Sequence, residues 1–163
     1  MSDDNSTRDA NGDLDDKGVS GLDHLLSIID GRSPRAPISA TLGFDLVAVE
    51  FGKAVFEGKT GEHLRNPMGT VHGGFAATLL DSALGSAVLT QLPAGLAYST
   101  AQLNVNMIRP VMPVTGTLRA TAQVIHLGRS LATAEARLNG IDDGKMYAHA
   151  TATCAIFPVR RRT

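Results

Sequence analysis

One carboxylate interrupts a stretch of apolar and small residues in this sequence. Residues 75–89 read FAATLLDSALGSAVL, where Asp81 is the only charged side chain. Because burying an ionised carboxylate without partners is costly, such a group is expected to find a hydrogen-bond donor. Two interpretations are open. Asp81 is either a structural carboxylate satisfied by hydroxyls such as Thr78 or Ser82, or a nucleophile or general base held in a pocket.

His72, Gly73 and Gly74 stand just ahead of this stretch. Two glycines are poor residues for a helix interior, but they suit a helix start where a ligand must approach the backbone. The first N–H groups of a helix lack internal partners and lie at the positive end of its dipole. They could hold a substrate carbonyl or an oxyanion. The alternative is a plain tight turn into a helix, and His72 is expected to orient the loop 66–71 rather than to act as an acid or base.

The helix predicted over 72–91 is apolar on every side. A helix of this kind is buried all round, which predicts a sheet curled around it and a second subunit that closes the side left open. At the helical rise per residue, Gly73 and Asp81 are about 12 Å apart, too far to act on one carbonyl within one chain. If both are catalytic, the site combines Gly73 of one subunit with Asp81 of another, as a two-fold dimer allows.

The remaining elements are mainly strands. A helix is predicted to begin at Ser20 or Asp23 and to end at Gly31, and a Pro-containing connector, SPRAPIS, follows it. Strands are predicted over 42–51, 53–59, 98–107, 116–126, 130–139 and 145–157, and residues 98–107 show the strict alternation of a half-buried strand. Because no parallel strand–helix–strand rhythm is present, the fold class is α+β, an antiparallel sheet packed on one helix.

Composition excludes several classes of protein. Apolar residues make up 43% and charged residues 19%, which is typical of a globular domain, here expected over 18–163. Residues 1–17 contain six Asp and are expected to be a disordered acidic tail. A net charge of −1 shows no basic excess of the kind that nucleic-acid binders carry. No secretory signal and no membrane-spanning run are found, so a cytoplasmic protein without membrane partners is expected.

The sequence also argues against other kinds of catalytic chemistry. Cys154 is the single cysteine, so neither an intrachain disulfide nor a CxxC metal site is possible. The histidines show no metal-ligand spacing such as HExxH, so no metal is expected. The GxSxG motif of α/β serine hydrolases is absent.

The motif N-x-x-G-T-x-H-G-G at 66–74, with Asp81 seven residues later, resembles the PaaI-type hotdog-fold acyl-CoA thioesterases. That group includes the phenylacetate-pathway thioesterases and the thioesterase superfamily member 2 proteins. The resemblance covers residues 40–157, and NVNMIRP at 104–110 is similar to a family strand that ends in Arg-Pro. It implies the hotdog fold and hydrolysis of acyl-CoA or aryl-CoA thioesters without a cofactor, since coenzyme A is part of the substrate. It also implies a homodimer with sites at the interface, assembled as a dimer of dimers.

The resemblance carries roles to single positions. Asp81 would be the nucleophile or the general base that activates water, and the Gly73 N–H would polarise the thioester carbonyl. Asn66 would orient the water or the thioester, and His72 would hold the loop and hydrogen-bond near the carbonyl. Thr100 matches a position where relatives carry a hydroxyl near the catalytic carboxylate.

Substrate binding is expected at three further residues. Gly74 belongs to the helix start, and the hairpin HLGRSL at 126–131 resembles the place where relatives contact the nucleotide part of coenzyme A. Arg129 and Ser130 are therefore candidate contacts, although a lone arginine beside a hairpin glycine is often only solvated.

Two other functions are weighed against thioester hydrolysis. One is a hotdog dehydratase or hydratase acting on acyl-CoA or acyl-carrier-protein substrates, which would use a His and a carboxylate at a different spacing. The other is a non-catalytic acyl-CoA-binding protein, which would have lost the carboxylate or the Gly-Gly turn. Both features are present here.

Overall fold

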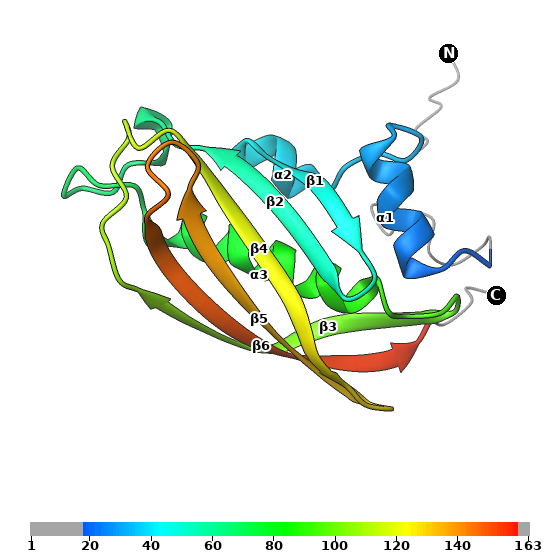
Figure 1. Cartoon of the computed structure of the whole chain (residues 1–163). Helices are drawn as coiled ribbons and strands as arrows, with labels where there is room; N and C mark the ends of the chain where they lie inside the picture. The colour runs from blue at the N-terminus through cyan, green and yellow to red at the C-terminus, as the bar shows by residue number, and fades with distance from the viewer. Residues whose placement is uncertain (1–17, 160–163) are drawn as a thin grey trace, which may run out of the picture.

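A six-stranded antiparallel sheet curves around one long helix (Figure 1). The computed structural model describes residues 18–159, so the segment 1–17 and its expected disorder lie outside the described residues. The sheet order is β1-β2-β4-β5-β6-β3, which leaves β1 and β3 as edge strands. The strands are β1 (Phe44–Glu50), β2 (Lys53–Lys59), β3 (Leu96–Met107), β4 (Thr117–Leu127), β5 (Leu131–Gly140) and β6 (Met146–Pro158).

The helices confirm the predicted α+β class. The described residues form α1 (Gly21–Ile29), α2 (Pro37–Leu42), the one-turn η1 (Glu62–Leu64) and the central α3 (Gly73–Leu89). One helix wrapped by a curved sheet is the hotdog arrangement that the resemblance implied. No helix in the part of the chain that the structure describes is long and apolar enough to cross a membrane.

Helix α2 corrects the prediction of a connector followed by a strand from residue 42. Pro37 occupies the first helical position, where its fixed φ suits a helix and its missing N–H is not needed. Gly43 then ends the helix in the left-handed conformation, with φ of 72°. The prolines predict an irregular connector, whereas Pro37 starts a helix.

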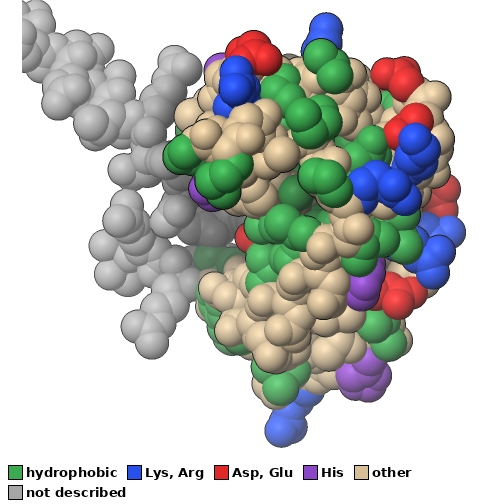
Figure 2. All heavy atoms as spheres, turned by 90° about the vertical axis from the view of Figure 1, so that its left-hand side faces the viewer, with side chains coloured by type: hydrophobic (Ala, Val, Ile, Leu, Met, Phe, Trp, Pro, Cys, Tyr) green, Lys and Arg blue, Asp and Glu red, His purple; other side chains and the backbone are tan. Residues whose placement is uncertain are grey.

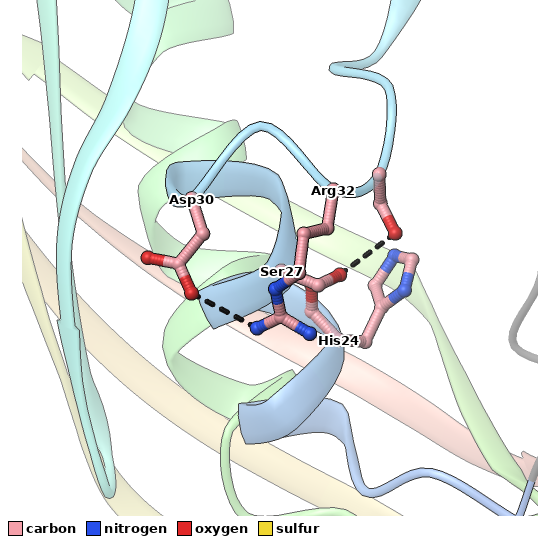
Figure 3. A network of polar contacts seen from close by, with 5 residues as sticks. His24, Ser27, Asp30 and Arg32 are labelled. Carbon is pink, nitrogen blue, oxygen red and sulfur yellow. Dashed lines mark hydrogen bonds and ion pairs between the residues drawn. The ribbon is translucent and has the colours of Figure 1, made fainter.

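Helix α1 begins where predicted and ends slightly earlier. Ser20 caps it by accepting a hydrogen bond from the Asp23 N–H, and the last helical residue is Ile29 rather than a residue next to Gly31. Within this helix, the Ser27 hydroxyl donates to the His24 carbonyl at 2.6 Å. Just after it, Arg32 pairs with Asp30 at 2.9 Å (Figure 3). These contacts close the end of a helix that packs against β1.

The core lies between α3 and the inner face of the sheet. Small side chains on β5 and β6 let the helix approach closely, as the alanine pattern predicted, and all of them are at most 4% exposed: Ala132, Ala134, Ala136, Ala148, Ala150 and Ala152. On α3, the residues that are not fully buried recur on one side of the helix: Gly73, Gly74, Ala77, Thr78, Asp81 and Ser82. The sheet therefore leaves one narrow strip of α3 uncovered, and Asp81 lies on it.

Strand β3 contains a bulge that the predicted strict alternation did not include. Thr100 pairs with Cys154 while Gln102 pairs with Thr153, so Ala101 is an extra residue in β3. The extra residue changes which side chains face inward: Thr100 contacts α3 on one side of the bulge, and Leu103 packs against the core on the other. In a regular strand with Leu103 inward, Thr100 would point away from α3.

Candidate active site

Asn66 organises the loop that leads into α3. Its Oδ1 accepts hydrogen bonds from the backbone N–H groups of Met68 at 3.0 Å and Thr70 at 3.2 Å. Its Nδ2 donates to Thr70 Oγ1 at 2.8 Å. The Asn66 side chain thus shapes the loop. An amide nitrogen carries two hydrogens, and the second Nδ2 hydrogen has no acceptor among the described residues, so it is left for a ligand.

His72 is the N-cap of α3, which agrees with its expected orienting role. Its Nδ1 accepts a hydrogen bond from the Gly74 N–H at 2.8 Å, and its carbonyl accepts one from the Phe75 N–H at 3.0 Å. Because Nδ1 is an acceptor here, the neutral ring carries its hydrogen on Nε2. The Gly74 N–H is therefore occupied by the cap and is not a second donor toward a substrate.

The Gly73 N–H is the first donor of α3, and no acceptor for it is found among residues 18–159. Gly73 lines a cavity of about 320 Å³ together with Asn66 and His72. The rest of the wall is mostly apolar: Val71, Ala76, Met107, Ile108, Pro110, Val111, Leu138 and Ala148, with Thr70, Arg109 and Tyr147. Figure 2 faces this end of the molecule and shows hydrophobic side chains gathered around a hollow.

The missing side chain at Gly73 also affects the packing of β3 against α3. A Cβ at this position would lie 2.7 Å from Met107 Sδ, at the end of β3. The absence of a side chain lets Met107 pack against the start of α3 while the N–H stays accessible from the cavity.

Asp81 obtains its hydrogen bond from the sheet and not from its own helix. Thr100 Oγ1 on β3 donates to Asp81 Oδ1 at 3.0 Å. Thr78, one of the partners expected for a structural carboxylate, instead donates to the Gly74 carbonyl at 2.8 Å. No bond from Ser82 to Asp81 is found in the described chain. Oδ2 accepts no hydrogen bond from residues 18–159, so one carboxylate oxygen is held in place and the other is open.

Tyr98 and Cys154 lie behind this pair and were not singled out from the sequence. Burial raises the pKa of the Tyr98 phenol, and the nearby Cys154 and Asp81 raise it further. Burial also raises the pKa of the Cys154 thiol, against the effect of the Thr100 hydroxyl. Gly85, one turn after Asp81, leaves room for the Tyr98 ring against α3. The alternation along this strand could have identified Tyr98, since Tyr98 is two residues before Thr100 and lies on the same face of the strand.

The predicted residues fall into three places within one chain. Asn66, His72 and Gly73 meet at the cavity, whereas Asp81 and Thr100 meet two turns further along α3. Arg129 and Ser130 are exposed on the β4–β5 hairpin. The next residue, Leu131, pairs with Ala155 on β6, which places this hairpin at the Thr100 end of the sheet. No cluster of three or more metal-ligating side chains is found among the residues described.

The fold is that of a hotdog domain, and comparison with known proteins places the chain in a family. Residues 68–146 match the family model of the Thioesterase superfamily. The chain is 31% identical over 125 residues to acyl-coenzyme A thioesterase 13 of Homo sapiens, which covers 76% of this chain and 88% of that protein. The chain therefore belongs to the thioesterase superfamily.

Other relatives agree with this assignment. A protein of Halobacterium salinarum, provisionally named an esterase, is 42% identical over 67 residues, which is 41% of this chain and 44% of that protein. The chain thus matches less than half the length of that relative. The crystal structure of a phenylacetic acid degradation-related protein from Ralstonia eutropha JMP134 superposes with a TM-score of 0.73 at 31% identity, over 80% of this chain and 98% of the other.

Replacing His72 tests its role as a cap. His72→Ala removes the acceptor for the Gly74 N–H and should lower the free energy of unfolding by about 1 kcal/mol, the usual cost of losing an N-cap. His72→Asn keeps a side-chain acceptor and should recover most of this loss. Urea denaturation measures both variants, and equal stability of the alanine variant and the original protein would contradict the cap.

Proposed function

We propose that this protein hydrolyses acyl-CoA or aryl-CoA thioesters to the free acid and coenzyme A. The observation that carries the proposal is the Asp81 carboxylate, whose Oδ1 is held by Thr100 and whose Oδ2 is open, on the only uncovered strip of α3 in the described chain. Family membership supports the same chemistry, because relatives are named acyl-coenzyme A thioesterase and 1,4-dihydroxy-2-naphthoyl-CoA hydrolase.

The groups present suffice for thioester hydrolysis. The Gly73 N–H donates to the thioester carbonyl oxygen and stabilises the negative charge that develops there. Asp81 Oδ2 either attacks the carbonyl carbon or takes a proton from a water that attacks it. The carbon–sulfur bond breaks, coenzyme A leaves as its thiolate and takes up a proton, and the acid is released. In the nucleophilic route, the acyl group first stays on Asp81 as an anhydride, and the acid is released only when water hydrolyses that anhydride.

The two halves of this site belong to different subunits in our proposal. Gly73 and Asp81 are about 12 Å apart along a straight helix, so one chain cannot bring both to a single carbonyl. A dimer in which the β3 edges of two chains pair antiparallel brings the Gly73 end of one chain to the Asp81 end of the other. Each dimer then holds two equivalent sites.

The strand register of this dimer follows from the positions of Thr100 and Met107. Thr100 contacts Asp81, and Met107 lies against Gly73, so Thr100 of one chain must face Met107 of the partner subunit. On β6, Ala148 pairs with Met107 and Cys154 pairs with Thr100. Thr151 lies midway between these two β6 residues, and Thr151 pairs with Asn104. The two-fold axis therefore passes beside Asn104, with the two Asn104 residues opposite each other.

The assay for the proposed activity follows thiol release from a panel of acyl-CoA and aryl-CoA esters. Wild-type protein should release coenzyme A from at least one of them. Asp81→Ala and Asp81→Asn should lose at least about 100-fold in kcat, because each removes the base or nucleophile. Absence of release from the whole panel, or full activity in both variants, would refute the assignment and leave the binding or dehydratase alternatives.

Mixing subunits tests whether the site is shared. Gly73→Pro removes the N–H and adds a Cβ beside Met107, and the helix should tolerate it, since proline suits the first helical position and His72 already has the extended backbone (ψ 131°) that precedes proline. Gly73→Ala, which keeps the N–H and displaces only the tip of Met107, is the matched control. Hybrids of inactive Gly73→Pro and inactive Asp81→Ala subunits should regain up to half of the activity per dimer. Verified hybrids without activity would argue for a site within one chain.

Cysteine cross-linking tests the register. Asn104→Cys should form an interchain disulfide under mild oxidation, because directly opposed residues have Cα atoms about 4.5–5.5 Å apart. Asn106→Cys on the same exposed face should not, since the two residues would be about 14 Å apart along the strands. The native Cys154 is fully buried and common to both variants. Preferential cross-linking of the Asn106 variant would exclude this register.

A further inference from the structure

Arg109 is the one residue with a permanent positive charge in the wall of the cavity that Gly73 lines. It follows β3, and its backbone is fixed: the N–H groups of Ile108 and Arg109 both donate to the Tyr147 carbonyl, at 2.9 and 3.2 Å. The side chain itself is exposed. The backbone of Arg109 is thus fixed by hydrogen bonds, while its guanidinium is exposed to solvent at the cavity.

Arg109 lacks the ion pair that six of the ten Lys and Arg residues in 18–159 have. Arg32, Arg35, Lys53, Arg65, Arg119 and Lys145 each pair with a carboxylate. Within residues 18–159, no salt bridge involves Arg109. The guanidinium is therefore free to bind an anion brought by a ligand.

Asp143 is the carboxylate that interacts electrostatically with Arg109, and its oxygens already accept hydrogen bonds from other donors. Asp143 Oδ1 accepts the Lys145 N–H at 3.0 Å, and Oδ2 accepts the Tyr147 hydroxyl at 2.8 Å and lies 3.7 Å from Lys145 Nζ. These contacts, with the backbone N–H as the largest cause, lower the pKa of the Asp143 carboxyl. Asp143 thus makes its hydrogen bonds within its own loop, and its Coulombic interaction with Arg109 is not a salt bridge.

We propose that Arg109 binds an anionic group of the substrate, and that this group is a carboxylate on the acyl part. The inference rests on the proposed thioesterase function, which puts the thioester carbonyl at the Gly73 N–H. Since Gly73 and Arg109 line the same cavity of about 320 Å³, an acyl group entering it from the carbonyl meets the guanidinium after a short apolar spacer. The phosphates of coenzyme A are separated from the carbonyl by the whole pantetheine arm, so they are less well placed to reach it.

The test compares a neutral and an anionic acyl group of equal length on two carriers. Pentanoyl and glutaryl thioesters are made with coenzyme A and with N-acetylcysteamine, which has no phosphate. In Arg109→Met, the glutaryl-to-pentanoyl ratio of kcat/KM should fall about tenfold with both carriers, because a charge-assisted hydrogen bond is lost. Arg137→Met is the matched control, since Arg137 is also without a salt bridge in the described chain but is exposed on β5 beside a groove that shares no lining residue with the cavity at Gly73. It should leave the ratio unchanged.

The outcomes separate the sources of the anion. A loss confined to coenzyme A esters, equal for both acyl groups, would keep Arg109 as an anion-binding residue and identify phosphate as its partner. An unchanged ratio and unchanged kcat/KM with every ester would overturn the proposal.

A binding measurement keeps this inference separate from the proposed activity. If wild-type protein hydrolyses none of the esters, the thioesterase proposal fails, and calorimetry with the uncleavable S-(4-carboxybutyl)-CoA and S-pentyl-CoA still tests Arg109. Arg109→Met should weaken binding of the carboxylate-bearing thioether about tenfold relative to the pentyl thioether. Equal affinity ratios in the variant and in the wild type would overturn the anion-binding role.

Discussion

The near-complete burial of α3 is the constraint on which the rest of this structure depends. Leu79, Leu80 and Leu84 are fully buried, so the helix cannot turn or slide without opening cavities in the core. Both candidate catalytic groups are carried by this one rigid element. Their separation is therefore set by helix geometry, and a shared carbonyl requires a second helix from a partner chain.

The edge strand β3 supplies the hydrogen-bond donor for Asp81, which α3 itself does not provide. The bulge at Ala101 lets Thr100 face Asp81 while Leu103, further along the same strand, still packs inward. Bulges are frequent at sheet edges and beside active sites, where they redirect a side chain. Because β3 is unpaired on its outer side in the single chain, the strand that positions Asp81 is also the one available for pairing with a second copy.

The proposed dimer also agrees with the distribution of charge along α3. The helix begins beside Arg109 and presents the positive end of its dipole to the cavity, while Asp81 lies two turns further on. Antiparallel pairing would bring the positive end of one chain to the carboxylate of the other. A developing oxyanion and an anionic acyl group would both meet positive potential, and the attacking group would come from the opposite chain.

The elements of the fold were readable from the sequence because they depend on local periodicity. The apolar run predicted the buried α3, the alanine pattern predicted close helix–sheet packing, and spacing along the helix separated Gly73 from Asp81. The motif at 66–74 identified the loop and the helix start. Helix α2 was missed because proline at a first helical position and proline as a breaker look alike in one sequence.

The details of the site depended on contacts between residues far apart in the chain. The sequence by itself determined that a carboxylate interrupts a buried helix and that a glycine pair begins it. Only the tertiary structure decided that Thr100 is the partner of Asp81, because a bulge of one residue reverses the inward face of a strand. It also decided that His72 occupies the Gly74 N–H and that Arg109 forms no salt bridge with any residue of 18–159. Hydrogen bonds of this kind depend on where distant segments lie, and residue spacing does not encode that.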